Sequence, residues 1–279
     1  MRVALIGGSG QLGTEIRRRW TDDEIVAPPH AEIDIEDAAA VAAMLDAVKP
    51  DAVVNCAAFH NVDRCEAEPG RAFAVNAVAV DRVAHLCDER STAFVTISTD
   101  YVFDGNATAP YREAAVPHPL SLYGLSKLAG EHLALRGGGR VFVVRTCGLY
   151  GNSVEGRRPF IERVLAADSQ MLRVVADVVV SPTFAGHLAA ALRRLVATDA
   201  YGLYHAVNAG AVSWYDFACE ARKQAGRSDS VEPIAADEWK AAAVRPRFSA
   251  LENDKLDALG IGMPSWRDGI GAYLALKVR

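Results

Sequence analysis

Residues 2–13 read RVALIGGSGQLG, a short apolar run that passes directly into a cluster of glycines. Gly7, Gly10 and Gly13 are three positions apart, and Gly8, Gly10 and Gly13 also satisfy the pattern G-x-G-x-x-G. Such glycines let a turn adopt positive φ and let a pyrophosphate approach the backbone, and the N-terminus of the following helix offers free N–H donors. The stretch predicts a strand, a dinucleotide-binding turn and a helix, in that order. A tight turn without a ligand is the alternative.

Further apolar runs repeat the strand pattern along the chain. Each is four to six residues long, rich in Val and apolar on both faces, which is typical of strands buried in a parallel sheet. They cover residues 24–28, 52–55, 94–99 and 141–146. Helical patterns lie between them, so we expect an α/β fold with a doubly wound parallel sheet and right-handed crossovers.

The pattern loosens after residue 150, where shorter strand-like and helical segments are mixed with prolines. This change predicts a dinucleotide-binding domain over residues 1–150, to which residues 170–200 return. Residues 151–169 and 201–279 would form a smaller substrate-binding portion over the open end of the sheet.

The composition is that of an ordinary globular protein, with 51% hydrophobic and 23% charged residues in a chain of 279. The formal net charge is -5, and no basic block extends beyond Arg17, Arg18 and Arg19, which argues against nucleic-acid binding. No apolar run is long enough for a membrane span, and no export signal is visible. The five cysteines never occur as CxxC, so we expect reduced thiols in the cytoplasm and neither disulfides nor a metal site.

The cofactor preference follows from the end of the second predicted strand. NAD enzymes usually carry an acidic residue there for the ribose 2′-hydroxyl. This chain has Pro28, Pro29 and His30 instead. Without the carboxylate a 2′-phosphate meets no repulsion, and Arg17, Arg18 or His30 could neutralise it. NADP(H) is therefore favoured, while use of NAD(H) stays open.

Residues 121–132, SLYGLSKLAGEH, place Tyr123 four positions before Lys127. On a helix the two side chains project from one face about one turn apart, so a phenol and an ammonium could act on the same small group. A half-buried tyrosine beside a solvated lysine would show the same spacing.

Several motifs occur in order along nearly the whole chain: GGSGQLG, NCAAFHNVDRCEAEP, ISTDYVFDG, YGLSKLAGE, VVRTCGLYG, SPT, VRPRFSAL and SWRDGIGAYL. Together they resemble the extended short-chain dehydrogenase/reductases, and specifically the dTDP-4-dehydrorhamnose reductase group. The resemblance implies NAD(P)H-dependent reduction of the 4-keto group of a nucleotide-linked 6-deoxyhexose, with dTDP-4-dehydro-L-rhamnose as the first substrate to try. It leaves a homodimer open.

The same resemblance implies a catalytic trio of Thr99, Tyr123 and Lys127. Tyr123 would donate a proton to the keto oxygen, and Thr99 would hydrogen-bond that oxygen. Lys127 would bind the nicotinamide ribose and favour the ionised phenol, bringing the pKa of Tyr123 closer to the working pH.

Further site residues are carried over from the resemblance. The residues expected at the cofactor are Gly7, Gly10, Gln11, Leu12, Gly13, His30, Asp34, Ile35, Ala57, Ala58, His60, Asn76, Ser98, Tyr123 and Lys127. The residues expected at the substrate are Val62, Asp63, Thr99, Asp100 and Arg245. A solvated loop carboxylate is the alternative for Asp63, and a surface ion pair is the alternative for Arg245.

The chain also departs from the family pattern. Cys147 and Gly148 follow the Arg-Thr pair where the family often has a tryptophan, and Val178 and Val180 replace polar and flexible members of a later motif. Some relatives bind magnesium through glutamates at a dimer interface. Glu15 is present here, but Gly186 and His187 stand where a second ligand would be expected. The exact sugar, the metal and that dimer are therefore open.

Two other classes of function remain: another enzyme of the same group, and a non-catalytic subunit. A nucleotide-sugar dehydratase of this group would carry Thr-Asp-Glu, whereas the chain has Thr99, Asp100 and Tyr101, and an epimerase is harder to exclude by motif. A relative of this family is a non-catalytic regulatory subunit of methionine adenosyltransferase, which binds a dinucleotide without turnover.

Overall fold

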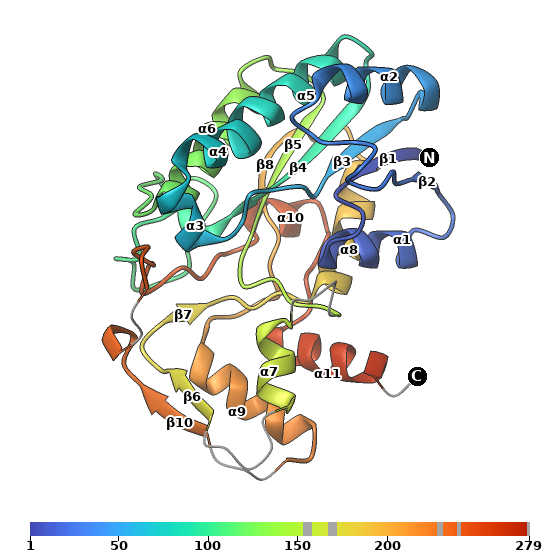
Figure 1. Cartoon of the computed structure of the whole chain (residues 1–279). Coiled ribbons are helices and arrows are strands. Elements are labelled where there is room, and N and C mark those ends of the chain that lie inside the picture. Colours follow the sequence, from blue (N-terminus) through green and yellow to red (C-terminus); the bar gives the residue numbers. More distant parts are fainter. Residues whose placement is uncertain (153–157, 167–171, 228–230, 239–240, 278–279) are drawn as a thin grey trace.

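The computed structural model describes residues 1–152, 158–166, 172–227, 231–238 and 241–277. Its centre is a six-stranded sheet in the order β2-β1-β3-β4-β5-β8, in which every pair of neighbours is parallel (Figure 1). The strands are β1 (Arg2–Ile6), β2 (Glu24–Val26), β3 (Ala52–Asn55), β4 (Ala93–Thr99), β5 (Val141–Thr146) and β8 (Gly202–His205). The predicted parallel sheet is confirmed, and its first five strands begin and end within two residues of the predicted runs.

Helices cover both faces of this sheet. On one face lie α1 (Gln11–Arg19) and α8 (Ala185–Val196), and on the other lie α2 (Ala38–Val48), α5 (Ala79–Asp88) and α6 (Leu122–Leu135) (Figure 1). Successive side chains of a strand point to opposite faces, so Val3 and Leu5 enter the core under α1 and α8, whereas Ala4 and Ile6 enter the core under the other helices. This double burial explains why the strands are apolar throughout.

Short elements connect these layers near the ends of the strands. They are α3 (Val62–Ala67), α4 (Pro69–Phe73), the π-helical turn η1 (Ala74–Val78), the 3₁₀ turn η2 (Asp100–Val102) and α10 (Asp254–Ala258). The turn η1 runs directly into α5 and packs against α6. The ends of β3 and β4 therefore lead into α3 and η2, where side chains can reach a shared space.

A second, smaller part lies below the sheet in Figure 1. It contains α7 (Phe160–Ala166), the parallel pair β6 (Leu172–Val175) and β10 (Val231–Ile234), the antiparallel pair β7 (Val179–Val180) and β9 (Val212–Ser213), α9 (Trp214–Gln224), η3 (Ala236–Glu238) and α11 (Trp266–Lys277). Its own core is rich in aromatic rings, including Phe184, Phe217 and Tyr273. Ser213 caps α9 by accepting a hydrogen bond from the Asp216 N–H group at 2.9 Å.

One strand departs from the expected division of the chain. Residues 201–279 were assigned to the substrate-binding portion, yet β8 pairs with β5 at the edge of the main sheet. The division into two domains stays a prediction. Of the residues it covers, 153–157, 167–171, 228–230, 239–240 and 278–279 lie outside the described part of the chain. Among the described residues, no helix combines the length and the apolar character that a membrane crossing requires.

Candidate active site

The glycine turn lies at the point where the strand order reverses, between β1 and β3. In open α/β sheets, ligands bind beyond the carboxyl ends of the strands at such a point. Gly7 has a φ of 77°, and a Cβ atom on it would lie 2.7 Å from the backbone nitrogen of Ala57, so this position requires glycine. Gly10 then begins α1 without any side-chain cap, which leaves N–H groups of the first turn for a ligand.

A cleft of about 600 Å³ opens beside this turn, at the carboxyl ends of the strands. That volume is in the range of small-molecule sites. Twelve of the residues expected at cofactor or substrate line it: Gly10, Gln11, Leu12, Ala57, Ala58, His60, Val62, Ser98, Thr99, Asp100, Tyr123 and Lys127. The structure therefore brings expected residues from four separate segments of the sequence to one cavity.

The expected trio meets in this cleft. Thr99 ends β4, while Tyr123 and Lys127 lie in the first two turns of α6. The helix can approach because Gly124 has no side chain: a Cβ atom there would lie 2.1 Å from the carbonyl oxygen of Tyr101. As a result, the rings of Tyr101 and Tyr123 meet edge to face with centroids 5.6 Å apart.

Hydrogen bonds fix the polar groups around Thr99. Its hydroxyl group donates to Asp100 Oδ1 at 3.2 Å and accepts from the Tyr101 N–H group at 3.2 Å. Ser249, from the last part of the chain, donates to Asp100 Oδ2 at 2.6 Å. Burial raises the pKa of Asp100, and these hydrogen bonds oppose the shift. Both carboxylate oxygens of Asp100 therefore accept hydrogen bonds from neighbouring side chains of the protein.

Burial also shifts the pKa values of Tyr123 and Lys127. It raises the pKa of Tyr123, with a hydrogen bond from Thr99 opposing, and it lowers the pKa of Lys127 to about 8, with the charge of Glu131 opposing. The expectation that Lys127 would bring the pKa of Tyr123 down is therefore not met: desolvation of the half-buried phenol raises that pKa, and the ammonium group bonds to the carbonyl oxygen of Ile97 at 2.7 Å. Tyr123 is neutral at physiological pH and carries a proton that it can donate.

Asp63 and Arg245, both expected at the substrate, bind each other. Arg245 donates from Nη1 to Asp63 Oδ1 at 3.2 Å and from Nη2 to Oδ2 at 2.9 Å, and the Ala243 N–H group donates to Oδ1 at 3.0 Å. The pair joins α3, whose first residue Val62 lines the cleft, to the last part of the chain. The hydrogen bond from Arg245 holds the pKa of Asp63 below its usual range. Neither Asp63 nor Arg245 is among the described residues that line the cleft.

The other expected residues lie behind or beside the cleft. Asn76 is 1% exposed and holds the loop before α3, because it exchanges hydrogen bonds of 2.9 and 3.0 Å with the backbone of Phe59. Ile35 is 3% exposed and packs in the core. His30 and Asp34 lie 4.0 Å apart on the surface after β2. Like these four, Gly7 and Gly13 are outside the cleft lining, since they shape the turn.

Seven residues of the lining are not among the expected cofactor and substrate residues. They are Ser9, Cys56, Ile97, Tyr101, Thr146, Gly148 and Leu149. Most of them lie at or just beyond the end of a predicted strand, so position at the carboxyl edge of the sheet was a usable signal.

Gly148 lies where the family pattern often has a tryptophan, and a tryptophan from elsewhere packs against it. The ring of Trp214, the first residue of α9, lies 3.0 Å from the place that a Cβ atom on Gly148 would take. Gly148 itself has a φ of 52°. The indole of Trp214 thus supports the wall of the cleft at Gly148.

Glu15, the residue that matches a magnesium ligand of some relatives, forms ion pairs with two arginines. Its carboxylate is 1% exposed, accepts from Arg19 Nε at 2.7 Å and lies 3.8 Å from Arg18 Nη1. In the described part of the chain, no group of three or more His, Cys, Asp or Glu side chains could hold a metal ion.

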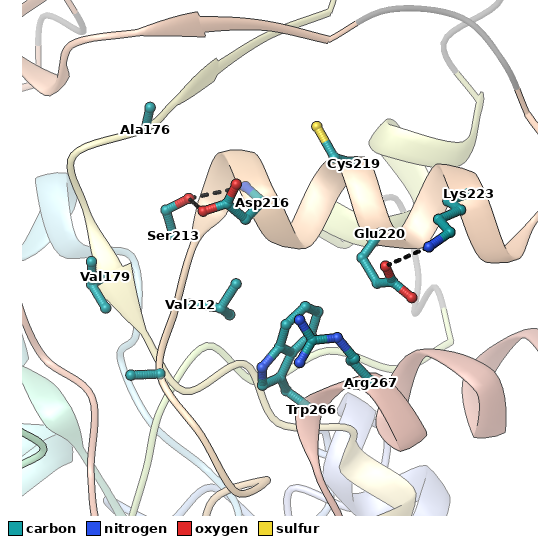
Figure 2. A pocket seen from close by; sticks show the side chains of 11 residues that line it. Ala176, Val179, Val212, Ser213, Asp216, Cys219, Glu220, Lys223, Trp266 and Arg267 are labelled. Carbon is teal, nitrogen blue, oxygen red and sulfur yellow. Dashed lines mark hydrogen bonds and ion pairs between the residues drawn. The ribbon is translucent and has the colours of Figure 1, made fainter.

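A second cavity, of about 650 Å³, lies in the smaller part between β7, α9 and the start of α11 (Figure 2). Its polar groups are largely engaged with one another: Ser213 bonds to Asp216, and Lys223 lies 3.9 Å from Glu220. The guanidinium group of Arg267 lies over the ring of Trp266 at 4.1 Å. The described residues that line this second cavity include no member of the trio or of the glycine turn. The cleft beside the glycine turn is therefore the candidate active site.

A dinucleotide turn at the reversal of a parallel sheet, with a threonine, a tyrosine and a lysine in one cleft, defines the class of the extended short-chain dehydrogenase/reductases. Within that class, the chain belongs to the family described as RmlD substrate binding domain, whose model matches residues 1–278. The resemblance noted in the sequence is thereby confirmed.

Named relatives agree over the full length. A dTDP-4-dehydrorhamnose reductase from Streptomyces griseus is 35% identical over 95% of this chain and 90% of its own. A spore coat polysaccharide biosynthesis protein from Bacillus subtilis is 34% identical over 98% of this chain and 96% of its own. The crystal structure of dTDP-4-dehydrorhamnose reductase from Bacillus anthracis in complex with NADP is 32% identical, covers 98% of each chain and has a TM-score of 0.94.

Proposed function

We propose that this protein uses NADPH to reduce the 4-keto group of a nucleotide-linked 6-deoxyhexose to a hydroxyl group, with dTDP-4-dehydro-L-rhamnose as the first substrate to test. One observation carries the proposal: Thr99, Tyr123 and Lys127 line one cleft together with the start of α1. The family and the activities named for its members support the choice of reaction and of cofactor.

The residues of the cleft fit a dinucleotide. Gly10 brings bare backbone to the start of α1, where N–H groups and the positive end of the helix dipole favour a pyrophosphate. Among the described residues, the Oε1 atom of Gln11 is buried without a hydrogen-bond partner, so it can accept a hydrogen bond from a bound molecule. Bound NADPH supplies the hydride for the carbonyl carbon.

The protein's own groups handle the proton. As negative charge develops on the keto oxygen, the neutral phenol of Tyr123 donates its proton to that oxygen, and the Thr99 hydroxyl group turns its proton from Asp100 Oδ1 to the same oxygen. The Tyr101 N–H group donates to the Thr99 oxygen and keeps it in place while this proton turns. Lys127, whose ammonium group bonds to the carbonyl oxygen of Ile97, is the proposed partner of the nicotinamide ribose.

On the substrate side, Arg245 is the proposed partner of the nucleotide diphosphate. A guanidinium group offers two parallel N–H donors to phosphate oxygens as it does to a carboxylate. Asp63, which directly follows the cleft residue Val62, holds those donors in a bidentate pair. Binding of a diphosphate by Arg245 thus requires that it share or exchange its partner.

The direct test is a spectrophotometric assay. Purified protein is mixed with NADPH and dTDP-4-dehydro-L-rhamnose, and the loss of absorbance of the reduced nicotinamide is followed. Related dTDP- and UDP-linked 4-keto-6-deoxy sugars are run in parallel. Conversion of the sugar without net oxidation of NADPH would favour an epimerase. Tight NADPH binding without turnover of any keto-sugar would favour the regulatory-subunit function.

Three finer expectations stay predictions. They are the two-domain division, a homodimer and a cytoplasmic location.

A further inference from the structure

Glu131 continues the face of α6 that carries Tyr123 and Lys127. The three residues follow one another at intervals of four positions, about one helical turn each. Glu131 is 3% exposed, and both of its carboxylate oxygens are engaged. Oε1 accepts from the Ser98 hydroxyl group and from Arg145 Nε at 2.9 Å, and Oε2 accepts from Arg145 Nη2 at 2.6 Å. A buried carboxylate with two such partners is rigidly held.

These contacts join the two elements that carry the trio. Ser98 directly precedes Thr99 at the end of β4, and it lines the cleft. The neighbouring Ile97 accepts the hydrogen bond of Lys127. The helix α6 is therefore attached to β4 at two consecutive residues just before Thr99. This attachment sets the separation between the phenol on the helix and the hydroxyl group on the strand, which a reacting carbonyl oxygen must match closely.

The charges around Glu131 are unequal. Lys127 faces it from the same helix, and Arg145 faces it from β5 at 3% exposure. Beyond Arg145 lies His205 of β8, whose Nε2 atom is 3.4 Å from Arg145 Nη1. Burial, with Arg145 adding to it, lowers the pKa of His205 to about 3, so its imidazole is neutral. Two cations thus depend on the one carboxylate of Glu131.

Among the described residues, Cys56 and Tyr123 lie near Lys127 and carry no compensating charge. Burial raises the pKa of Cys56, at the end of β3, to about 12, and it raises the pKa of Tyr123 as well. Both groups are therefore neutral near pH 7. Asp100 lies beyond Thr99 and bonds to Thr99 and Ser249. Glu113 contacts the backbone N–H group of His205 at 3.2 Å.

We propose that Glu131 is a positioning residue for the reduction: it fixes α6 against β4 through Ser98 and Arg145, and it supplies the negative charge that faces Lys127. This inference rests on the proposed function, because the positioned groups are those of the trio. Glu131 touches neither cofactor nor substrate in this scheme and acts through Ser98 and Lys127.

The test compares four variants with the wild-type protein. Glu131→Gln removes the charge and one acceptor. Glu131→Gln combined with Arg145→Met removes both members of the ion pair, so that no buried arginine is left unpaired. Ser98→Ala removes the link to β4 and keeps every charge. Glu89→Gln is the matched control, since it removes one carboxylate charge from an exposed position at the end of α5.

Two readouts separate positioning from folding. The first is the pH profile of kcat in the NADPH assay. The second is the titration of Lys127 by NMR in protein labelled with ¹³C at the lysine Cε atoms, with the Lys127 signal assigned by Lys127→Met. The NMR titration needs no turnover. If the wild-type protein fails to turn over any keto-sugar, the proposed function fails, while the titration still tests the influence of Glu131 on Lys127.

We expect Glu131→Gln to lower kcat about 10-fold or more and to move the titration of Lys127, with the alkaline limb of kcat, about one pH unit lower. The double variant loses one charge of each sign, so it should lower kcat similarly while its Lys127 titration moves less. Ser98→Ala should lower kcat about 3-fold or more with the alkaline limb in place. Glu89→Gln should match the wild type. The proposal is overturned if folded Glu131→Gln keeps the wild-type titration of Lys127, or if the folded double variant or Ser98→Ala keeps the wild-type kcat.

Discussion

The ammonium nitrogen of Lys127 lies 2.7 Å from the carbonyl oxygen of Ile97, and this hydrogen bond draws a lysine into the interior of the protein. Lys127 is 4% exposed, and its burial lowers its pKa to about 8. Lysines are ordinarily solvated. The position of Lys127 therefore links the charge of the candidate site to the stability of the fold.

The first prediction concerns stability against pH. Between about pH 8 and pH 10 the folded protein has released the Lys127 proton while the unfolded chain still holds it, so raising the pH favours folding. From pH 7.5 to 9.5 this group should add roughly 1–2 kcal/mol to the free energy of unfolding. Urea unfolding of the wild-type protein and of Lys127→Met at both pH values measures the difference. Equal pH dependence of the two proteins would contradict the prediction.

Tyr123→Phe should lower kcat by about 100-fold or more, because the general acid is lost while the ring remains. The affinity for NADPH, measured by fluorescence titration, should change little. Tyr101→Phe is a suitable control, since its ring lies beside that of Tyr123 and its hydroxyl group has no assigned role in proton transfer. A fully active Tyr123→Phe protein would show that Tyr123 is not the proton donor.

The glycine turn offers a matched pair of substitutions. Gly7→Ala should destabilise the protein by about 2 kcal/mol or more, because φ is 77° and the new Cβ atom would lie 2.7 Å from backbone. Gly10→Ala should leave the melting temperature almost unchanged, since φ is -72° and the nearest atom is 3.4 Å away. Its methyl group should nevertheless lower NADPH affinity about 10-fold or more, because Gly10 lines the cleft. Calorimetry measures the stability of both variants, and cofactor titration measures their affinity for NADPH. A destabilised Gly10→Ala protein or an unaltered melting temperature in Gly7→Ala would contradict the prediction.

Arg245→Gln should raise the KM for the nucleotide sugar about 10-fold and change kcat less than about 3-fold, as expected for loss of a binding contact. Arg247→Gln tests the specificity of that effect. It lies two residues further on and pairs with Asp177 and Asp237 instead. Similar KM values in the two variants would assign Arg245 to a structural ion pair with Asp63.

His30→Asp should shift the cofactor preference towards NADH. A carboxylate after β2 repels the 2′-phosphate and can bind a 2′-hydroxyl group. The backbone there runs close to the glycine turn, since a Cβ atom on Gly8 would lie 2.9 Å from the Cβ atom of Ala27. We expect kcat/KM for NADPH to fall about 10-fold while kcat/KM for NADH is kept or raised. An unchanged ratio would place the 2′-phosphate away from His30.

Local signals in the sequence were sufficient for the sheet and for much of the cleft. The apolar runs that became β1 to β5 are recognisable because both faces of a parallel strand are buried. The glycine turn and the spacing of Tyr123 and Lys127 are local as well. Their meeting in one cavity follows from the rule that the strands of a parallel sheet end at the same edge.

Contacts between distant polar residues could not be predicted in this way. Asp63 and Arg245 are 182 positions apart, and Ser249 and Asp100 are 149 apart, so no periodicity connects them. The sequence analysis named Asp63, Asp100 and Arg245 as separate substrate residues. The role of Glu131 could not be predicted either. Its helical spacing shows that it shares a face with Tyr123 and Lys127, but it does not show that Ser98 and Arg145 pack against that face.

The late arrival of β8 in the chain has a consequence for synthesis. β5 ends at Thr146, but the strand that pairs with its outer edge begins at Gly202. While the polypeptide is being translated, that edge of β5 carries unpaired backbone groups until Gly202 has left the ribosome. Open strand edges recruit other strands. A message truncated before this codon should therefore yield a fragment that aggregates through the open edge of β5.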